Sequence, residues 1–210
     1  MNDENCIVYV VDDDPSVRTL LKKLMQSIGL PVEVYASSRE FLDHPHPAVP
    51  SCLILDVRMP GQSGFELQEQ LASSSQAVPI VFITGFGNVP QSVRAMKAGA
   101  VDFLEKPFEN QELLDAVNRA LERSRRFLER RGEESKIEEL VKTLSPREYD
   151  VFVRIVAGLA NKEAAHELGL SEKTVKIHRA RVMRKMNAGS FAELVRMAER
   201  LRISVKQPQP

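Results

Sequence analysis

The chain has 210 residues, of which 43% are hydrophobic and 28% are charged, and its formal net charge at pH 7 is zero. This is the composition of an ordinary globular protein with one or two domains. No apolar run approaches the roughly 20 residues that a membrane-spanning helix needs. The acidic start, from Met1 to Asn5, lacks the basic and apolar parts of a signal peptide, so we expect a cytoplasmic protein with no membrane partner.

The net charge of zero hides an uneven distribution. Residues 1–142 carry 22 acidic and 16 basic side chains, a net charge of −6, whereas residues 143–210 carry 7 and 13, a net charge of +6. We expect only the basic part to meet a polyanion. The two cysteines, Cys6 and Cys52, stand alone within apolar segments, and we expect them to be reduced core residues.

The first 124 residues alternate short apolar runs with amphipathic runs of helical length. Strands are expected at residues 7–11, 32–35, 52–55, 80–83 and 101–104. Helices are expected from Pro15 to about Gly29, after the capping box Ser37-x-x-Glu40, over residues 65–71 and 90–98, and from about Glu109. Five strand–helix units of this length predict a doubly wound α/β domain with a parallel sheet.

Polar side chains stand where four of these apolar runs end. Asp12 and Asp13 follow the first run, Asp56 the third, Thr84 the fourth, and Lys106 lies just beyond the fifth. The carboxyl ends of parallel strands meet at one edge of a sheet, so these side chains should converge. Because crowded carboxylates repel one another unless a cation lies among them, the pattern predicts a divalent metal ion and a phosphate-type ligand.

The chemistry of these groups suggests a role for each. Asp56, on the central strand, can attack a phosphorus atom as a carboxylate nucleophile. Asp12 and Asp13 can hold Mg²⁺, which prefers oxygen ligands, and the backbone carbonyl of Arg58 can supply another ligand. Lys106 offers a positive charge to a phosphoryl oxygen.

Single residues of this set have simpler interpretations. Thr84 can donate a hydrogen bond to a phosphoryl oxygen, but a lone aspartate after a strand usually caps a helix, and a lone lysine is usually exposed. The joint pattern favours a site. Asp14, at the same edge, is expected to cap the following helix or to support the site from behind, and not to bind the metal.

Residues 125–142 are rich in charge and are expected to form a linker with helical character. Gly132 offers a break, after which Ser135-x-x-Glu138 can start a second short helix. Alternatively, Phe127 and Leu128 can prolong the preceding helix into a dimer contact. The sequence leaves both arrangements open.

The remainder of the chain is expected to be all helical. Four helices should begin at the caps Ser145, Asn161, Ser171 and Ser190 and end near residues 158, 169, 186 and 202. The tail, residues 206–210, is expected to be disordered. The second and third helices, joined by Gly169-Leu170, have the spacing of a helix-turn-helix.

The third of these helices has a basic face. At 100° per residue, Val175, Val182 and Met186 fall on one side and should be buried, whereas the opposite side is basic. A basic exposed face near a helix amino terminus suits the major groove of DNA, although it also occurs on solvated helices in ordinary bundles. The residues expected to contact DNA are Lys173, Thr174, Lys176, Ile177, Arg181 and Arg184.

Four segments resemble the receiver domain of two-component response regulators: Val10-Val-Asp-Asp-Asp-Pro15, Leu55-Asp-Val-Arg-Met-Pro-Gly61, Ile83-Thr-Gly85 and Glu105-Lys-Pro-Phe108. The resemblance covers residues 5–124 and implies a flavodoxin-like receiver, assigned to residues 1–124. It implies that Asp56 accepts phosphate from a sensor histidine kinase, and that the peptide bond before Pro107 is cis. It further implies Mg²⁺ as cofactor, bound by Asp12, Asp13 and Asp56, with Thr84 and Lys106 as phosphate contacts and Phe103 as a switch aromatic.

Four further segments resemble the LuxR/NarL-type DNA-binding domain: Leu144-Ser-Pro-Arg-Glu148, Gly158-Leu-Ala-Asn-Lys162, Leu170-Ser-Glu-Lys-Thr-Val-Lys-Ile-His178 and Val182-Met-Arg-Lys-Met186. This domain is assigned to residues 143–205, and the whole chain is most similar to the FixJ branch. The resemblance makes residues 171–186 the recognition helix and gives residues 190–202 a part in dimerisation. The implied partners are promoter DNA, RNA polymerase and, after phosphorylation, a second copy of the chain.

These features predict a transcription regulator that is switched by phosphorylation and is not an enzyme. One alternative is a metal-dependent phosphohydrolase with Asp56 as nucleophile. Such an enzyme would require a second carboxylate as acid–base group two residues later, where this chain has Arg58. Another is a DNA-binding regulator with a vestigial receiver, which the intact set of acids, hydroxyl and lysine disfavours.

Overall fold

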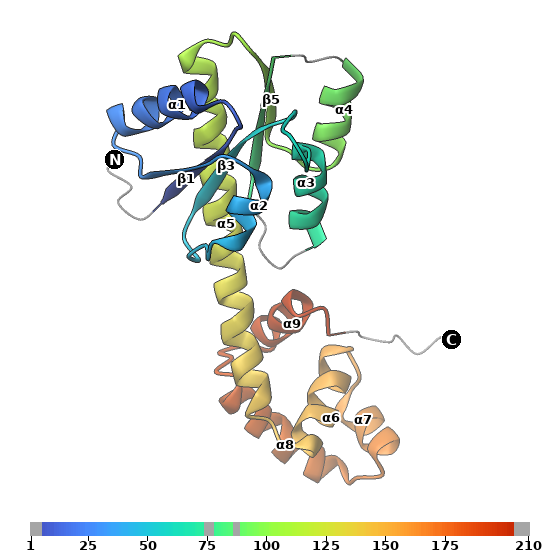
Figure 1. Ribbon diagram of the computed structural model, residues 1–210. Coiled ribbons are helices and arrows are strands. Elements are labelled where there is room, and N and C mark those ends of the chain that lie inside the picture. Colours follow the sequence, from blue (N-terminus) through green and yellow to red (C-terminus); the bar gives the residue numbers. More distant parts are fainter. Residues whose placement is uncertain (1–5, 74–77, 86–88, 204–210) are drawn as a thin grey trace. The chain divides into compact units, whose positions relative to one another are not determined.

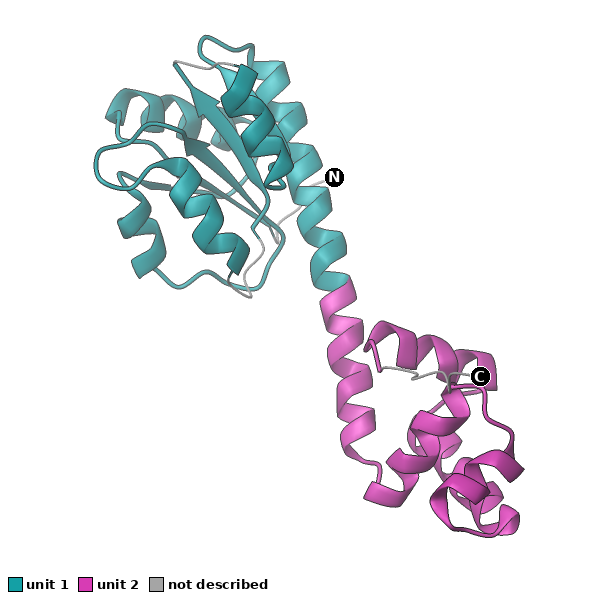
Figure 2. Cartoon of the chain, turned by 90° about the vertical axis from the view of Figure 1, so that its right-hand side faces the viewer, with its two compact units in different colours: residues 1–129 teal, residues 130–210 magenta. Residues whose placement is uncertain are grey.

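The computed structural model describes residues 6–73, 78–85 and 89–203 of the chain (Figure 1). The chain divides into two compact units, residues 1–129 and 130–210 (Figure 2). The acidic start, residues 1–5, and the tail, residues 206–210, fall outside the described residues, so the predictions for them are not tested. None of the described helices has both the length and the apolar character needed to cross a membrane.

The first unit contains a parallel sheet of five strands. They are β1 (Ile7–Val11), β2 (Val32–Tyr35), β3 (Ser51–Asp56), β4 (Ile80–Thr84) and β5 (Asp102–Glu105). Their order is β2-β1-β3-β4-β5, and every neighbouring pair is parallel. The predicted doubly wound α/β fold is confirmed. The chain reverses its direction of winding between β1 and β3, and ligands of such sheets bind beyond the strand ends at that position.

Helices cover both faces of this sheet because the strand residues alternate in direction. Val8 and Val10 of β1 pack in one core with residues of α1 (Pro15–Ser27) and α5 (Asn110–Lys142). Tyr9 and Val11 pack in the other core, with residues of α2 (Ser38–Asp43), α3 (Gly64–Ser73) and α4 (Val89–Lys97). All six residues of β3 are buried, as expected for a central strand covered on both faces.

Helix α5 is a single α-helix of 33 residues that continues through Gly132 to Lys142. Of the two arrangements that the sequence leaves open for residues 125–142, the structure has the continuous helix. A glycine in a helix interior costs only about 1 kcal/mol relative to alanine, which one residue in so long a helix can tolerate. Arg125 and Arg126 both pair with Glu122 one turn earlier and support the helix locally.

The second unit packs four further helices around one core. They are α6 (Pro146–Val156), α7 (Asn161–Leu168), α8 (Glu172–Lys185) and α9 (Phe191–Arg200). The predicted caps Ser145, Ser171 and Ser190 each accept a hydrogen bond from a backbone N–H of the first turn. The core includes Val151, Phe152, Ile155, Val175, Val182 and Met186, all fully buried.

The predicted cap of α7 is wrong by one residue. Ala160 occupies the cap position, and its N–H donates to the Glu163 carboxylate at 2.6 Å. Asn161 is the first helical residue, and its side-chain oxygen accepts from the Arg179 guanidinium at 3.3 Å. The tertiary contact with Arg179 and the glutamate at the third helical position together replace the expected local cap. Gly169 ends α7 in the left-handed conformation, with φ of 64°, which makes the predicted turn into α8.

Candidate functional site

The carboxyl ends of β1 and β3 bring two acidic side chains and one lysine together. Asp12 and Asp56 are 1% and 6% exposed. The ammonium of Lys106, which follows β5, donates to Asp12 Oδ2 at 2.7 Å and to Asp56 Oδ1 at 3.0 Å. Residues separated by 94 and 50 positions therefore meet at one edge of the sheet, as the strand-end pattern predicts.

Burial sets the electrostatics of this group. Burial raises the pKa of Asp56 above its usual value, and the ammonium of Lys106 offsets that rise only in part. Burial by itself lowers the pKa of Lys106, but hydrogen bonds to Asp12 and Asp56 outweigh it and raise that pKa. Two buried carboxylates thus share one lysine charge.

The donor set fits a hard cation such as Mg²⁺, because Asp12 and Asp56 offer carboxylate oxygens side by side. Within the described ranges, however, no three histidine, cysteine, aspartate or glutamate side chains form a group that could hold a metal ion. Lys106 is bonded to both buried carboxylates, and Asp13 is exposed. The predicted set of Asp12, Asp13 and Asp56 is therefore not assembled as a three-carboxylate cluster.

The loops next to these acids are held by backbone hydrogen bonds. The N–H of Arg58 donates to Asp56 Oδ2 at 2.7 Å, and the N–H of Asp14 donates to Asp12 Oδ1 at 2.9 Å. Asp14 itself caps α1, where its carboxylate accepts from the N–H of Ser16 at 2.7 Å. The predicted role of Asp14 as a helix cap is confirmed.

The other two predicted residues lie on β4 and β5. Thr84, at the end of β4, is 1% exposed, and its carbonyl accepts from the N–H of Lys106 at 2.7 Å. The Lys106–Pro107 peptide bond that follows is cis, as the resemblance implies. Phe103 is half-buried, and its ring centroid lies 6.2 Å from that of Phe82.

Gly64 also belongs to this site, although the sequence motifs did not indicate it. It begins α3, and its N–H donates to the carbonyl of Val57 at 3.1 Å. A Cβ atom on Gly64 would lie 2.3 Å from the backbone oxygen of Asp56 and 3.1 Å from the ring of Phe82. Only glycine lets α3 approach the end of β3 this closely. Its position at the end of the turn-rich segment 58–64 is the one feature of the sequence that could have indicated this role.

Gly64→Ala is therefore expected to destabilise the first unit by about 1–3 kcal/mol, because the clash is with backbone and not with a movable side chain. Hydrogen exchange of the β3 amides in increasing urea measures this. The matched control is Gly132→Ala in α5, where a Cβ meets no atom within 4 Å and should stabilise the helix by about 0.5–1 kcal/mol. Unchanged protection of β3 in Gly64→Ala would contradict the clash.

In the second unit, α8 presents the basic face that the sequence predicts. Val175 and Val182 are fully buried, and Ile177 is 46% exposed on the opposite side. The residues on this exposed side are Glu172, Lys173, Lys176, Ile177, Ala180, Arg181 and Arg184. These residues recur at the helical period, so they lie on one face of α8.

Two residues of α8 have contacts that the sequence did not indicate. Thr174 is half-buried, and its hydroxyl lies 2.7 Å from that of the cap residue Ser171, so it stands at the margin of the basic surface. Lys176 forms an ion pair with Glu172 at 3.0 Å. His178 is half-buried, and its Nδ1 is enclosed without a hydrogen-bond partner among the described residues.

Comparisons with known proteins assign both units to families. Residues 8–118 match the model of the response regulator receiver domain, and residues 142–198 match that of the bacterial regulatory proteins of the luxR family. Nodulation protein W of Bradyrhizobium diazoefficiens is 52% identical over 203 residues, which are 97% of this chain and 89% of that protein. The transcriptional regulatory protein FixJ of Azorhizobium caulinodans is 44% identical over 195 residues, 93% of this chain and 92% of that protein.

The chain belongs to the FixJ-type response regulators.

Such a regulator combines a receiver with a DNA-binding domain and acts in transcription regulation within a two-component system. A solved structure of the response regulator StyR is 48% identical to this regulator, with a TM-score of 0.78 over 93% of this chain and 98% of that chain. Neither the phosphohydrolase nor the vestigial receiver finds support in these comparisons.

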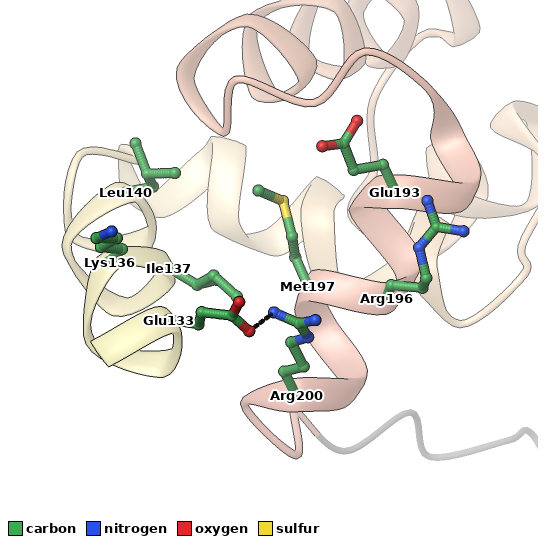
Figure 3. A pocket seen from close by; sticks show the side chains of 8 residues that line it. All are labelled: Glu133, Lys136, Ile137, Leu140, Glu193, Arg196, Met197 and Arg200. Atoms are coloured by element: carbon green, nitrogen blue, oxygen red, sulfur yellow. Dashed lines mark hydrogen bonds and ion pairs between the residues drawn. The ribbon is translucent and has the colours of Figure 1, made fainter. Parts of the chain in front are cut away.

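The second unit of the regulator also contains a groove that the sequence did not predict. It lies between the carboxyl-terminal part of α5 and α9 and has a volume of about 310 Å³ (Figure 3). Its apolar residues are Ile137, Leu140 and Met197, and an ion pair between Glu133 and Arg200 joins the two helices across it. Residues 60 positions apart line it together, so no local pattern could have indicated it.

Proposed function

We propose that Asp56 is the phosphoacceptor of this regulator, and that a sensor histidine kinase is the donor. The observation that carries the proposal is the ammonium of Lys106 between the buried carboxylates of Asp12 and Asp56. An Asp56 carboxylate oxygen attacks the phosphorus of a phosphohistidine, the phosphorus–nitrogen bond breaks, and the imidazole leaves. Asp56 then carries the phosphoryl group as a mixed anhydride.

The neighbouring residues then have defined tasks. We propose that Asp12, Asp13 and Asp56 hold Mg²⁺ with the backbone carbonyl of Arg58, and that the exposed Asp13 side chain joins the two buried carboxylates only when the metal binds. When bound, the metal neutralises charge on the transferring phosphoryl group. Lys106 holds one phosphoryl oxygen by charge, and the hydroxyl of Thr84 donates to another, which draws Thr84 toward Asp56. The same site would accept a small phosphodonor and would hydrolyse its own acyl phosphate slowly.

The movement of Thr84 is the start of the conformational response. It opens space into which the half-buried ring of Phe103 rotates, and α4 shifts in response. Val89, Val93 and Met96 of α4 are exposed apolar residues, and with β5 and α5 they form the surface that we assign to a phosphorylation-dependent dimer. Moving such an equilibrium from 1:99 to 99:1 requires about 5.5 kcal/mol of differential stabilisation.

The dimer places two copies of α8 on a promoter with two half-sites. We assign α8 to the major groove, with its basic face toward the bases and phosphates. The bound dimer then acts on RNA polymerase, most simply as an activator. Since promoter DNA lies in the bacterial cytoplasm, we propose that the protein works there.

A single titration tests this function. The full chain is incubated with a small phosphodonor with Mg²⁺ or with a chelator, and both phosphate incorporation and affinity for promoter fragments are measured in each sample. We expect incorporation and tighter DNA binding only with Mg²⁺. Incorporation without any change in DNA affinity would refute the switch, and DNA binding that is strong in every sample would favour a vestigial receiver.

Lys176→Ala tests the DNA surface separately. If Lys176 reads a base, the substitution should cost about 1–3 kcal/mol of operator binding and relax specificity at one position, because the lysine exchanges Glu172 for a base edge. Affinities for operators with single base changes, measured at one salt concentration, give the answer. Lys136→Ala, which removes an exposed lysine of α5 and leaves every residue of α8 unchanged, should change affinity by less than about 0.5 kcal/mol. An equal loss on every sequence would make Lys176 a phosphate contact.

A further inference from the structure

Helix α4, the element that has to move in the proposed switch, is weakly anchored to its unit. Its only buried residue is Ala95, and three of its apolar side chains, at positions 89, 93 and 96, are exposed. A helix of nine residues that buries so little surface is not held in one position by apolar packing alone. Its position in the unphosphorylated chain must depend on specific contacts with neighbouring elements.

Two such contacts come from α3 and reach adjacent residues of α4. Gln68 is 4% exposed, and its side-chain amide donates to the backbone oxygen of Ala95 at 3.2 Å. That oxygen also accepts from the N–H of Ala100, so the Gln68 side chain bonds to the backbone where the carboxyl-terminal turn of α4 ends. One residue earlier, Arg94 pairs with Glu69 of α3 at 2.8 Å.

Arg94 also contacts an aromatic residue of α3. Its guanidinium lies 4.8 Å from the ring centroid of Phe65. The Phe65 ring lies 5.2 Å from that of Phe82, and the Phe82 ring lies 6.2 Å from that of Phe103. Three rings in contact thus connect the α3–α4 junction to the residue that we assign as the switch aromatic, so a rotation of Phe103 alters the packing on which Arg94 rests.

We infer that Gln68 and Arg94 are positioning residues, which hold the carboxyl-terminal half of α4 against α3 while Asp56 is unphosphorylated. This inference rests on the function proposed above and deepens it. When Phe103 rotates, the contacts of Gln68 and Arg94 are released, and α4 moves away from α3. Their strength sets how much of the unphosphorylated protein already has the active arrangement.

The test uses linkage between this equilibrium and ligand binding. A ligand that prefers the active arrangement binds more tightly to a variant in which the resting arrangement is weakened. Beryllofluoride with Mg²⁺ serves as a non-covalent analogue of the phosphoryl group, so its affinity for Asp56 is an equilibrium quantity. Titration calorimetry of the full chain measures that affinity, and sedimentation measures dimer formation without the analogue.

Gln68→Met keeps the size of the buried side chain and removes the donor. We expect it to bind beryllofluoride about fivefold more tightly, and to form dimers at a correspondingly lower concentration, since one hydrogen bond is worth about that factor. The matched control is Gln70→Met on the same helix, where the exposed side chain accepts from Gln62 and does not reach α4. The control should leave both quantities unchanged.

Arg94→Glu provides a second test, which leaves the buried side chain of Gln68 in place. We expect Arg94→Glu to bind the analogue about twofold more tightly, because an exposed ion pair contributes little. The double variant Arg94→Glu with Glu69→Arg should return the affinity to the parent value. If Gln68→Met does not fold, this pair of variants decides the question. Unchanged or weaker analogue affinity in Gln68→Met, or failure of the double variant to restore the parent value, would overturn the inference. A wild-type chain that binds no analogue would instead refute the proposed phosphoacceptor.

Discussion

Replacing Asp56 with asparagine is expected to abolish phosphorylation of the chain and with it the phosphorylation-dependent gain in DNA affinity. The amide has the shape of the carboxylate but no anionic oxygen to attack phosphorus, and loss of a nucleophile costs several orders of magnitude in rate. Incorporation of labelled phosphate from a small donor, followed by promoter binding in the same samples, measures both effects.

The control for this experiment lies in the adjacent strand-to-helix loop. Asp14→Asn makes the same chemical change at the cap of α1, where asparagine caps about as well as aspartate. We expect Asp14→Asn to be labelled as well as the parent. Asp56→Asn should also stay folded, because a neutral side chain at a position 6% exposed avoids the cost of burying a charge. Labelling of Asp56→Asn at the parental level would show that another residue accepts the phosphate.

The second large effect is expected in the DNA-binding unit, at Glu148. This glutamate is 4% exposed and accepts from the N–H of Ser145 at 2.8 Å and from the ammonium of Lys185 at 2.6 Å. Lys185 also donates to the carbonyl of Thr143 at 2.9 Å. The ion pair therefore ties the last residue of α8 to the start of α6 and to the turn before it.

Glu148→Gln keeps the hydrogen bond from Ser145 but leaves the ammonium of Lys185 without its counter-charge. We expect a loss of about 2–3 kcal/mol in the stability of the second unit, somewhat below the range for fully enclosed pairs because Lys185 is 32% exposed. Hydrogen exchange of α6 and α8 in increasing urea measures it. The control is Glu163→Gln. Glu163 occupies the same position in α7, is exposed and accepts from the N–H of Ala160, so the substitution should lower the stability of the unit by less than about 1 kcal/mol.

The same pair gives the unit a pH dependence. The hydrogen bond from Lys185, together with that from the N–H of Ser145, lowers the pKa of Glu148 from 4.5 to about 2. Because the pKa is lower in the folded state, the stabilisation is complete above pH 4.5 and is lost as the pH falls toward 2. Glu148→Gln should lack this part of the acid destabilisation. Parallel stability curves of parent and variant between these pH values would contradict the assignment.

The positions of most helices and strands, and the chemical character of both sites, follow from local patterns in the sequence. Alternating apolar runs that end in Asp12, Asp56 and Thr84 are local patterns, and a parallel sheet has only one edge at which such ends can meet. The buried side of α8 could also be predicted, because Val175 and Val182 recur at the helical period. In these cases the information lies within one element, and the geometry of that element is fixed.

Contacts between residues far apart in the chain could not be predicted from local patterns. That Lys106 bonds to both buried acids, that α3 needs Gly64 to approach Asp56, and that Lys185 reaches Glu148 all depend on the packing of separate elements. The same holds for Asn161, whose expected local cap is replaced by a contact with Arg179. Local propensities differ by about 1 kcal/mol or less, so contacts between elements decide wherever the two compete.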